Sequence, residues 1–146
     1  MSRPDDVRFQ ADAHLEPDEV NAAYAWVEWP ARDAWRIEAA GRSSTWFTAR
    51  DAGGSLVGIC RLLDDGGLHA SVWDVIVRPD RQRQGIGRQL VGLALDRAAD
   101  RRLVVLVSTP TAVPFFESFG FIGESHGHRA LYLRPGGRPH IGHEAH

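Results

Sequence analysis

The residues with the clearest chemical potential lie between Ser71 and Ala98, in the stretch SVWDVIVRPDRQRQGIGRQLVGLALDRA. Its first part is rich in β-branched residues, as a strand is, and Pro79 should end that strand because proline cannot donate to a sheet ladder. Gly85 and Gly87 then open a helix with one apolar face. Because such a helix start offers free backbone N–H groups and a positive dipole end, we predict an anion site, and more particularly a phosphate site.

Five polar side chains stand in the turn beside these glycines: Arg81, Gln82, Arg83, Gln84 and Arg88. A solvated turn that only caps the helix does not account for three arginines and two glutamines together. A dinucleotide-binding fold is another reading of the glycines, but its fingerprint G-x-G-x-x-G needs a third glycine where this chain has Leu90. The turn therefore favours a phosphate-bearing ligand of a different class.

The composition is that of an ordinary globular domain, with 146 residues, 43% of them hydrophobic and 25% charged. A formal net charge of −2 gives no general basic field, so we predict neither a nucleic-acid nor a membrane partner. No apolar run approaches the ~20 residues of a membrane-spanning helix. The single cysteine, Cys60, excludes an internal disulfide and fits a reducing compartment, so we expect a cytoplasmic protein.

Strand and helix signals alternate along the chain. Strands are predicted over 7–15, 45–50, 56–63, 68–78 and 103–107, with a final pair over 121–123 and 129–133. Helices are predicted over 17–26, 32–40, the segment after the glycine turn, and 115–119. These elements predict a mixed sheet with helices on both faces, in a single domain over 1–134. Residues 135–146, rich in Gly, Pro and His, are expected to form a flexible tail.

Two motifs resemble those of a known family. VIVRPDRQRQGIGRQL is similar to the acetyl-CoA signature Gln/Arg-x-x-Gly-x-Gly/Ala of the GNAT superfamily of N-acetyltransferases, and FFESFGF (residues 115–121) resembles its FY-x-x-x-GF segment. They stand in the family's order and spacing, and the resemblance covers residues 45–134 well. VGICRLLDDGGLHASVWDVIVRPD more narrowly resembles the branch with plant chloroplast serotonin and protein-lysine N-acetyltransferases. The resemblance implies a GNAT-like α/β (α+β) fold with a mostly antiparallel central sheet.

The resemblance also implies acetyl-CoA as co-substrate, with no metal. The turn amides would hold its pyrophosphate, and the exposed backbone of residues 74–77 would pair with the pantetheine like an added strand. One amide near Val75 or Ile76 would polarise the thioester carbonyl. The predicted cofactor-binding residues are Val75, Ile76, Val77, Gln82, Arg83, Gln84, Gly85, Ile86, Gly87, Arg88, Thr109 and Phe116.

Acetylation of an amine needs a base, because an ammonium group cannot attack a thioester. Asp74 is the candidate, on the face of its strand opposite Trp73 and Val75, acting directly or through a water. The alternative is an aspartate that only hydrogen-bonds a neighbouring loop. His69 is a second candidate base on the same strand, although a lone strand histidine is more often structural.

The general acid is where the sequence departs from the family. Many members carry a tyrosine at the second position of the FY pair, where this chain has Phe116. Three accounts stay open: solvent protonates the leaving thiolate, Ser108 or Thr109 substitutes, or the protein is a weak catalyst. Thr109 also stands about where the family often has an asparagine that touches the pantetheine.

The aromatic residues suggest where the acceptor amine binds and what class of amine it is. Trp29 and Trp73 are predicted to contact it, beside Tyr24 and with Glu28 near an ammonium group, although most tryptophans simply pack in cores. We expect a small arylalkylamine or polyamine. The alternatives are a protein lysine or N-terminus as acceptor, or a catalytically weak acyl-CoA-binding module. The resemblance also allows a homodimer.

Two other features suggest no chemistry of their own. Cys60 is expected to be buried on a strand, with no adjacent base for an acetyl-cysteine route. His140, His143 and His146 are regularly spaced, but they stand in the Gly- and Pro-rich tail, so no metal site is predicted there.

Overall fold

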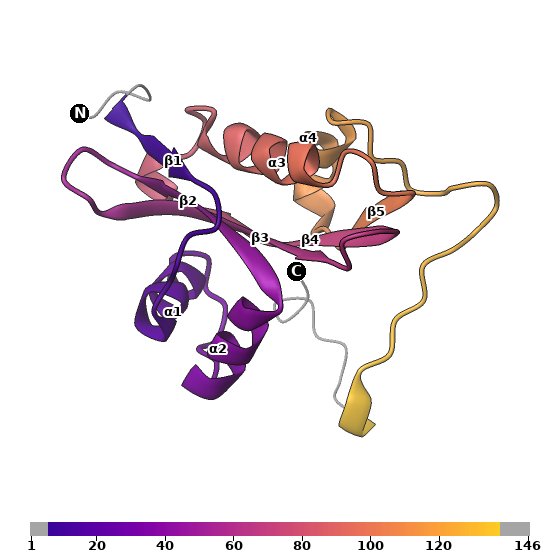
Figure 1. Ribbon diagram of the computed structural model, residues 1–146, viewed down its shortest axis with the longest axis horizontal. Coiled ribbons are helices and arrows are strands. Elements are labelled where there is room, and N and C mark those ends of the chain that lie inside the picture. The colour runs from indigo at the N-terminus through magenta and orange to yellow at the C-terminus, as the bar shows by residue number, and fades with distance from the viewer. Residues whose placement is uncertain (1–5, 138–146) are drawn as a thin grey trace. The chain divides into compact units, whose positions relative to one another are not determined.

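A computed structural model describes residues 6–137 (Figure 1). Within these residues, five strands form one sheet in the order β1-β2-β3-β4-β5. The strands are β1 (Arg8–Gln10), β2 (Ser44–Arg50), β3 (Leu56–Asp64), β4 (His69–Val77) and β5 (Leu103–Leu106). The helices are α1 (Pro17–Trp26), α2 (Ala34–Arg42), α3 (Ile86–Arg97) and α4 (Val113–Glu117). Neighbours from β1 to β4 are antiparallel and β5 is parallel to β4, so the predicted mixed, mostly antiparallel sheet is confirmed.

The chain divides into two compact units, one ending at Leu106 and one beginning at Val107. The first contains the whole sheet with α1, α2 and α3, and the second contains α4 between short 3-10 turns at 110–112 and 135–137. A single domain over 1–134 stays a prediction. Most of the predicted flexible tail, residues 138–146, lies outside the described residues.

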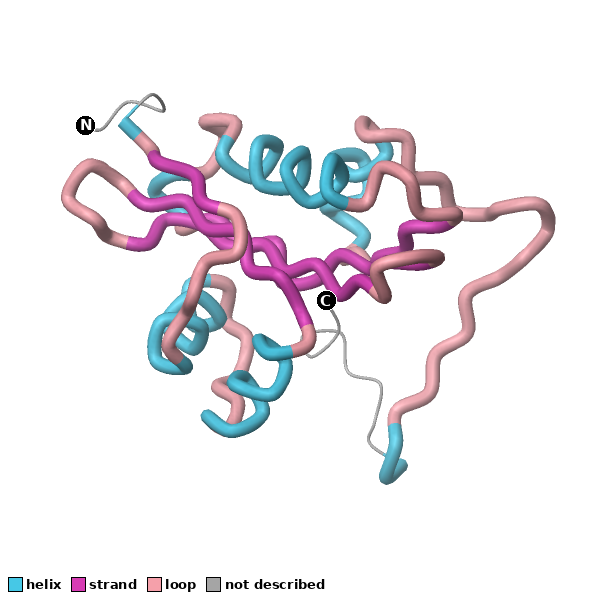
Figure 2. Tube along the Cα trace, in the orientation of Figure 1, coloured by secondary structure: helices cyan, strands magenta, loops and turns pink. Residues whose placement is uncertain are grey.

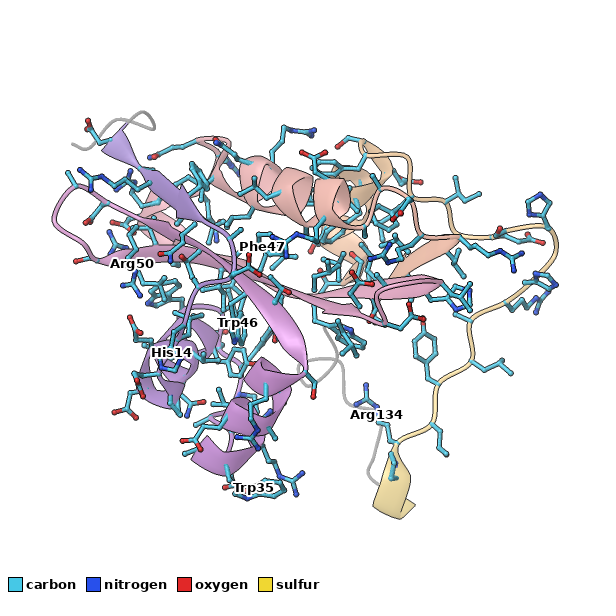
Figure 3. The ribbon with its side chains drawn as sticks, in the orientation of Figure 1. His14, Trp35, Trp46, Phe47, Arg50 and Arg134 are labelled. Atoms are coloured by element: carbon cyan, nitrogen blue, oxygen red, sulfur yellow. The ribbon has the colours of Figure 1, made fainter. Side chains whose placement is uncertain are left out.

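In the first unit, helices cover both faces of the sheet, as predicted (Figure 2). Ile86 and Leu90 of α3 pack on one face with Phe47, in a cluster that also holds Leu62 and Val72. The opposite face packs against α1 and α2, where the buried residues are Leu15, Val20, Ala23, Ile37, Trp46, Leu56, Ile59 and Ile76. Figure 3 shows the alternation of β2, with Trp46 on the α1/α2 side and Phe47 on the α3 side.

Local sequence signals explain where the main elements begin and end. α1 begins at Pro17, whose missing N–H costs nothing at the first helical position, and it matches the predicted range of 17–26. The Glu19 carboxylate reaches back to accept the backbone N–H of Glu16 at 3.3 Å, which satisfies a donor before the first turn. β4 ends at Val77, before Pro79, as predicted.

The predicted final strand pair, over 121–123 and 129–133, is wrong. In place of a ladder, the described part of this segment contains a single isolated bridge between Ser125 and His128. His126 and Gly127 both have positive φ angles there, at 53° and 78°, which makes a tight turn closed by a 2.9 Å backbone hydrogen bond. Apolar and aromatic residues favour a strand only where a partner strand completes the ladder, and the turn supplies just one bridge.

A close approach between α3 and β3 generates a stability prediction. A Cβ at Gly58 would lie 3.0 Å from Leu90 Cδ1 and 3.1 Å from Ile86 Cγ2, so Gly58→Ala must push the helix from the sheet. We expect it to lower the free energy of unfolding by about 1–3 kcal/mol. Gly92→Ala in α3 is the matched control, because no atom lies within 4 Å of its Cβ. It should raise the free energy of unfolding by about 0.5–1 kcal/mol. Denaturant titration measures both, and effects of the same sign would contradict the prediction.

Candidate active site

The turn between β4 and α3 has the backbone shape of an anion cradle. Arg83 and Gly85 have positive φ angles of 63° and 83°, and Gly85 is the residue that precedes the first turn of α3. No atom lies within 4 Å of the position of a Gly85 Cβ, so the space above this glycine is open. Since no side chain caps the start of α3, its first N–H groups are available to an anion.

The polar side chains of this turn divide into two groups. Arg81 is only 4% exposed and donates from Nε to Gln84 Oε1 at 3.1 Å, while Gln82 Nε2 donates to the Val77 carbonyl at 3.1 Å. These contacts hold the turn in its shape. Arg83 and Arg88 are exposed, and their charges therefore lie at the surface of the turn. Cofactor binding by these residues stays a prediction, and Arg81 supports the turn from inside.

β4 has a free edge beside this turn. β5 pairs with β4 only from His69 to Val72, so residues 73–77 have β3 on one side and no strand among residues 6–137 on the other. This is the separation of two strands that the family resemblance implies. The backbone N–H and C=O groups along Val75 to Val77, predicted to pair with pantetheine, therefore lie at an open sheet edge.

A β-bulge interrupts β4 at the predicted base. Trp73 pairs with Arg61 and Ile76 pairs with Ile59, so Asp74 and Val75 together stand opposite one residue of β3, Cys60. Asp74 has a φ angle of 54°, a strained value for a residue with a Cβ. Val75 packs with the α3-side cluster, so Asp74 and Val75 lie on opposite faces as predicted. The bulge places Asp74 on the same face as Trp73, the cross-strand neighbour of Arg61, so that half of the expectation is wrong.

The Asp74 carboxylate meets Arg61, whose side chain lies on the α1/α2 side of the sheet. Arg61 Nε donates to Asp74 Oδ2 at 2.8 Å, and Arg61 Nη1 donates to Ser44 Oγ at 3.0 Å. The two charged side chains are 4% and 16% exposed, for Asp74 and Arg61 respectively. A buried carboxylate of this kind requires its partners, because an unpaired charge out of water is costly.

Tyr24 of α1 completes this polar cluster. Burial together with the nearby Asp74 charge raises the pKa of its phenol far above the usual range. The phenol therefore stays protonated near the carboxylate. Its ring lies 5.7 Å from that of Trp29, and the Trp29 backbone N–H donates to the Tyr24 carbonyl at 2.9 Å.

The two predicted acceptor-contacting residues, Trp29 and Trp73, lie near Asp74 on different segments of the chain. Trp29 is linked to it through Tyr24, and Trp73 precedes it on β4, with its indole Nε1 donating to Ser71 Oγ at 2.6 Å. Contact of either indole with an acceptor stays a prediction. Sequence reasoning missed Arg61, although a single arginine inside the apolar run LVGICRLL was a signal for a buried charge pair.

Thr109 and Phe116 belong to the second unit. The Ser108 hydroxyl donates to the Thr109 carbonyl at 2.8 Å, and the Thr109 Oγ1 lies 3.4 Å from Thr111 Oγ1. The Phe116 ring packs edge-on, with centroids 5.0 Å from Phe115 and 6.2 Å from Phe121. Their predicted contacts with the cofactor, and the three accounts of the general acid, stay predictions.

Metal and membrane signals are absent from the part of the chain that the structure describes. No group of three or more His, Cys, Asp or Glu side chains in residues 6–137 is placed to hold a metal ion. No helix there is sufficiently long and apolar to cross a bilayer. The tail histidines at 140, 143 and 146 lie outside the described residues.

The open edge of β4, followed by an uncapped amide turn, is part of a fold that known proteins share. Residues 10–121 match the Acetyltransferase (GNAT) family. The chain therefore belongs to the GNAT family and carries its acetyltransferase domain. Members of this family generally use acetyl-CoA.

Individual relatives agree with this assignment. The chain is 26% identical over 136 residues to the N-acetyltransferase ycf52 of Pyropia yezoensis, covering 89% of this chain and 78% of that protein. Matches to the ycf52 proteins of Gracilaria tenuistipitata and Porphyra purpurea cover only 45% and 50% of those proteins. A histone acetyltransferase of Glycine max is 25% identical, with 87% of this chain and 61% of that protein covered.

Solved structures show the same fold. A GNAT family acetyltransferase of Streptococcus pneumoniae is 29% identical with a TM-score of 0.73, over 88% of this chain and 98% of that one. An acetyltransferase structure from Deinococcus radiodurans is 26% identical with a TM-score of 0.74, over 92% of this chain and 94% of that one. The GNAT-like fold predicted from the sequence is therefore confirmed.

The thiol of Cys60 generates a prediction about the route of transfer. Burial, with the nearby Asp74 charge, raises its pKa to about 12. Roughly one thiol in ten thousand is then ionised at pH 8, so Cys60 should be inert as a nucleophile in the folded protein. We expect a thiol reagent to label native protein only as fast as it unfolds, and denatured protein at once. Rapid labelling in native buffer, or a stable acetyl adduct on Cys60, would contradict direct transfer.

Proposed function

We propose that this protein transfers the acetyl group of acetyl-CoA to a primary amine by direct attack. The observation that carries the proposal is the free edge of β4 at residues 73–77, which leads directly into the uncapped turn before α3. An extended arm with amides and a pyrophosphate at its end is the ligand that such an edge and turn suit.

The residues of the chain have separate roles in this reaction. The turn amides bind the pyrophosphate, and an amide near Val75 or Ile76 donates to the thioester carbonyl as negative charge develops on its oxygen. The neutral amine forms a bond to the carbonyl carbon, and the carbon–sulfur bond breaks. Asp74 accepts the amine proton, directly or through a water, while Arg61 holds its carboxylate in place. Solvent, Ser108 or Thr109 protonates the thiolate, since Phe116 has no proton to give.

For the acceptor, we propose a small arylalkylamine or polyamine. Support comes from the aromatic side chains joined to the polar cluster, namely Tyr24 and Trp29 from the α1 side and Trp73 on β4. Aromatic faces attract an ammonium group and bury an apolar chain. We also propose a cytoplasmic location and leave a homodimer open to measurement.

Two other functions have specific support. The histone acetyltransferase among the relatives favours a protein acceptor, a lysine or an N-terminus. Phe116 at the usual tyrosine position favours a catalytically weak acyl-CoA-binding module. The first alternative predicts release of CoA thiol only with a peptide or protein acceptor, and the second predicts no amine-dependent release.

A thiol-release assay separates these functions. We expect purified protein to release CoA thiol from acetyl-CoA when arylalkylamines or polyamines are present, with Gly85→Ala as a comparison. Gly85 has a φ angle of 83° beside the open cradle, so a Cβ there should weaken acetyl-CoA binding and raise KM by about tenfold. Release only with lysine peptides or protein N-termini would favour a protein acceptor. Tight CoA binding without amine-dependent release would favour the binding module.

The role of Asp74 is tested by replacing one charge at a time. Asp74→Asn should lower kcat by about a hundredfold or more while the KM for acetyl-CoA stays within about twofold. Arg61→Gln is the matched control, because it breaks the same 2.8 Å ion pair and keeps the carboxylate. If both variants lose stability and activity equally, Asp74 is a structural anchor and not the base.

A further inference from the structure

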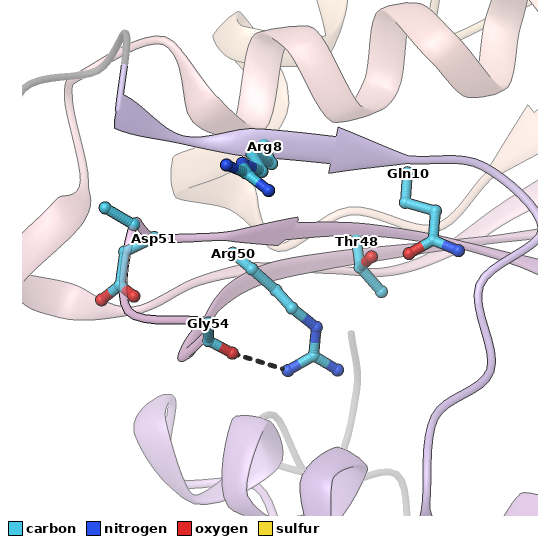
Figure 4. Close-up of a pocket in the computed structure, with 7 residues that line it drawn as sticks. Arg8, Gln10, Thr48, Arg50, Asp51 and Gly54 are labelled. Carbon is cyan, nitrogen blue, oxygen red and sulfur yellow. Dashed lines mark hydrogen bonds between the residues drawn. The ribbon is translucent and has the colours of Figure 1, made fainter.

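A second polar cavity lies at the other end of the sheet's strand order, along β1 and β2. Its volume is about 200 Å³, and it is lined by Arg8, Gln10, Thr48 and Arg50 together with the turn that follows β2 (Figure 4). None of these residues belongs to the predicted acetyl-CoA site. The cavity therefore requires its own explanation.

The strand register places two arginines on the same face of the ladder at this cavity. Arg8 pairs with Arg50, and Gln10 pairs with Thr48, so the four side chains form two cross-strand pairs on one face of the ladder. Like charges directly opposite each other on neighbouring strands destabilise a sheet. An arrangement of this kind suits a negatively charged occupant between the two guanidinium groups.

Only one of the two arginine charges is balanced by the protein. Arg50 Nη2 donates to Glu19 Oε2 at 2.8 Å, and Arg50 Nη1 donates to the Gly54 carbonyl at 3.2 Å. Within residues 6–137, the side chain of Arg8 has no hydrogen bond and no ion pair, and the residue is exposed. The acid at the cavity, Asp51, directs its Oδ1 to the backbone N–H groups of Gly53 and Ser55, at 3.0 Å each. The Arg8 guanidinium therefore keeps its donors for a ligand.

Thr48 supplies the second, independent observation. Its side chain is buried, at 1% exposure, and its hydroxyl has no hydrogen-bond partner in the described part of the chain. Buried hydroxyl groups in folded proteins nearly always have a partner. Because Thr48 lines the cavity, a ligand oxygen there can satisfy this hydroxyl, and Gln10 lines the cavity beside it.

We propose that this cavity binds a small oxyanion, a phosphate or carboxylate group. Arginine forks match the geometry of both groups, and the Thr48 hydroxyl adds a neutral donor. The volume of about 200 Å³ corresponds to about seven water molecules, since each occupies roughly 30 Å³ of liquid. The cavity therefore accommodates one such group with a few further atoms. The proposal is independent of the acetyl-transfer reaction.

The test is the thermal stability of the full chain with inorganic phosphate as the probe, at constant ionic strength set with chloride. It is run with and without saturating CoA, so that binding at the turn before α3 is distinguished from binding at the cavity. We expect phosphate to raise the Tm of the wild-type protein in both series. Arg8→Gln should lose this shift and weaken phosphate binding by about tenfold in calorimetry, because it removes a charged donor.

Two further variants make the result specific. Arg42→Gln removes an exposed charge of α2 outside the cavity and should keep the wild-type response. Thr48→Val removes only the hydroxyl and should weaken phosphate binding while the protein stays folded. Without phosphate, Arg8→Gln should be at least as stable as wild type, since the opposed arginine pair is gone.

The source of the oxyanion is distinguished by repeating the titration with acetate and succinate. A larger shift with phosphate assigns a phosphate group, and a larger shift with the carboxylates assigns a carboxylate. The proposal is overturned if Arg8→Gln and Arg42→Gln respond alike, or if chloride alone at the same ionic strength produces the wild-type shift.

Discussion

The ion pair between Arg61 and Asp74 is the interaction on which the active-site side of the sheet depends. A carboxylate that is 4% exposed has to find compensation inside the protein, and Arg61 of β3 supplies it. Ser44 at the start of β2 holds the other end of the guanidinium, and Tyr24 of α1 lies close enough for the Asp74 charge to raise the pKa of its phenol. The charge of one aspartate therefore fixes how α1 and two neighbouring strands meet at β4.

The bulge at Asp74 also changes the face of the sheet on which the fully buried side chains of β4 pack. Before the bulge, Ala70 and Val72 pack on the α3 side, and after it Ile76 packs on the α1/α2 side. One extra residue in β4 is sufficient for this exchange, because side chains alternate with a period of two. The strand can therefore be buried on both faces and still present a free edge over residues 73–77.

Sequence patterns predicted the elements well where the signals are local. Pro17 and the glycine turn fix helix starts, and hydrophobic periodicity places β2 to β5 within about two residues. The first strand, predicted over 7–15, is too long, because β1 ends at Gln10. Patterns failed where the outcome depends on distant partners. A positive φ at Asp74 leaves no trace in composition, since the alternating residues of this segment are typical of a regular strand. The segment over 129–133 has strand-like residues but no ladder in the described structure.

The turn before α3 shows why residue types alone overstate a binding site. Four polar side chains beside the two glycines, Gln82, Arg83, Gln84 and Arg88, are predicted ligand contacts. In the structure, Arg81, Gln82 and Gln84 form hydrogen bonds within the turn itself. A loop with two residues at positive φ needs such internal support, because its backbone conformation is strained at Arg83. The side chains that look like ligands thus hold the amides in position, and the amides of the backbone, with the exposed charges of Arg83 and Arg88, are what the turn presents to an anion.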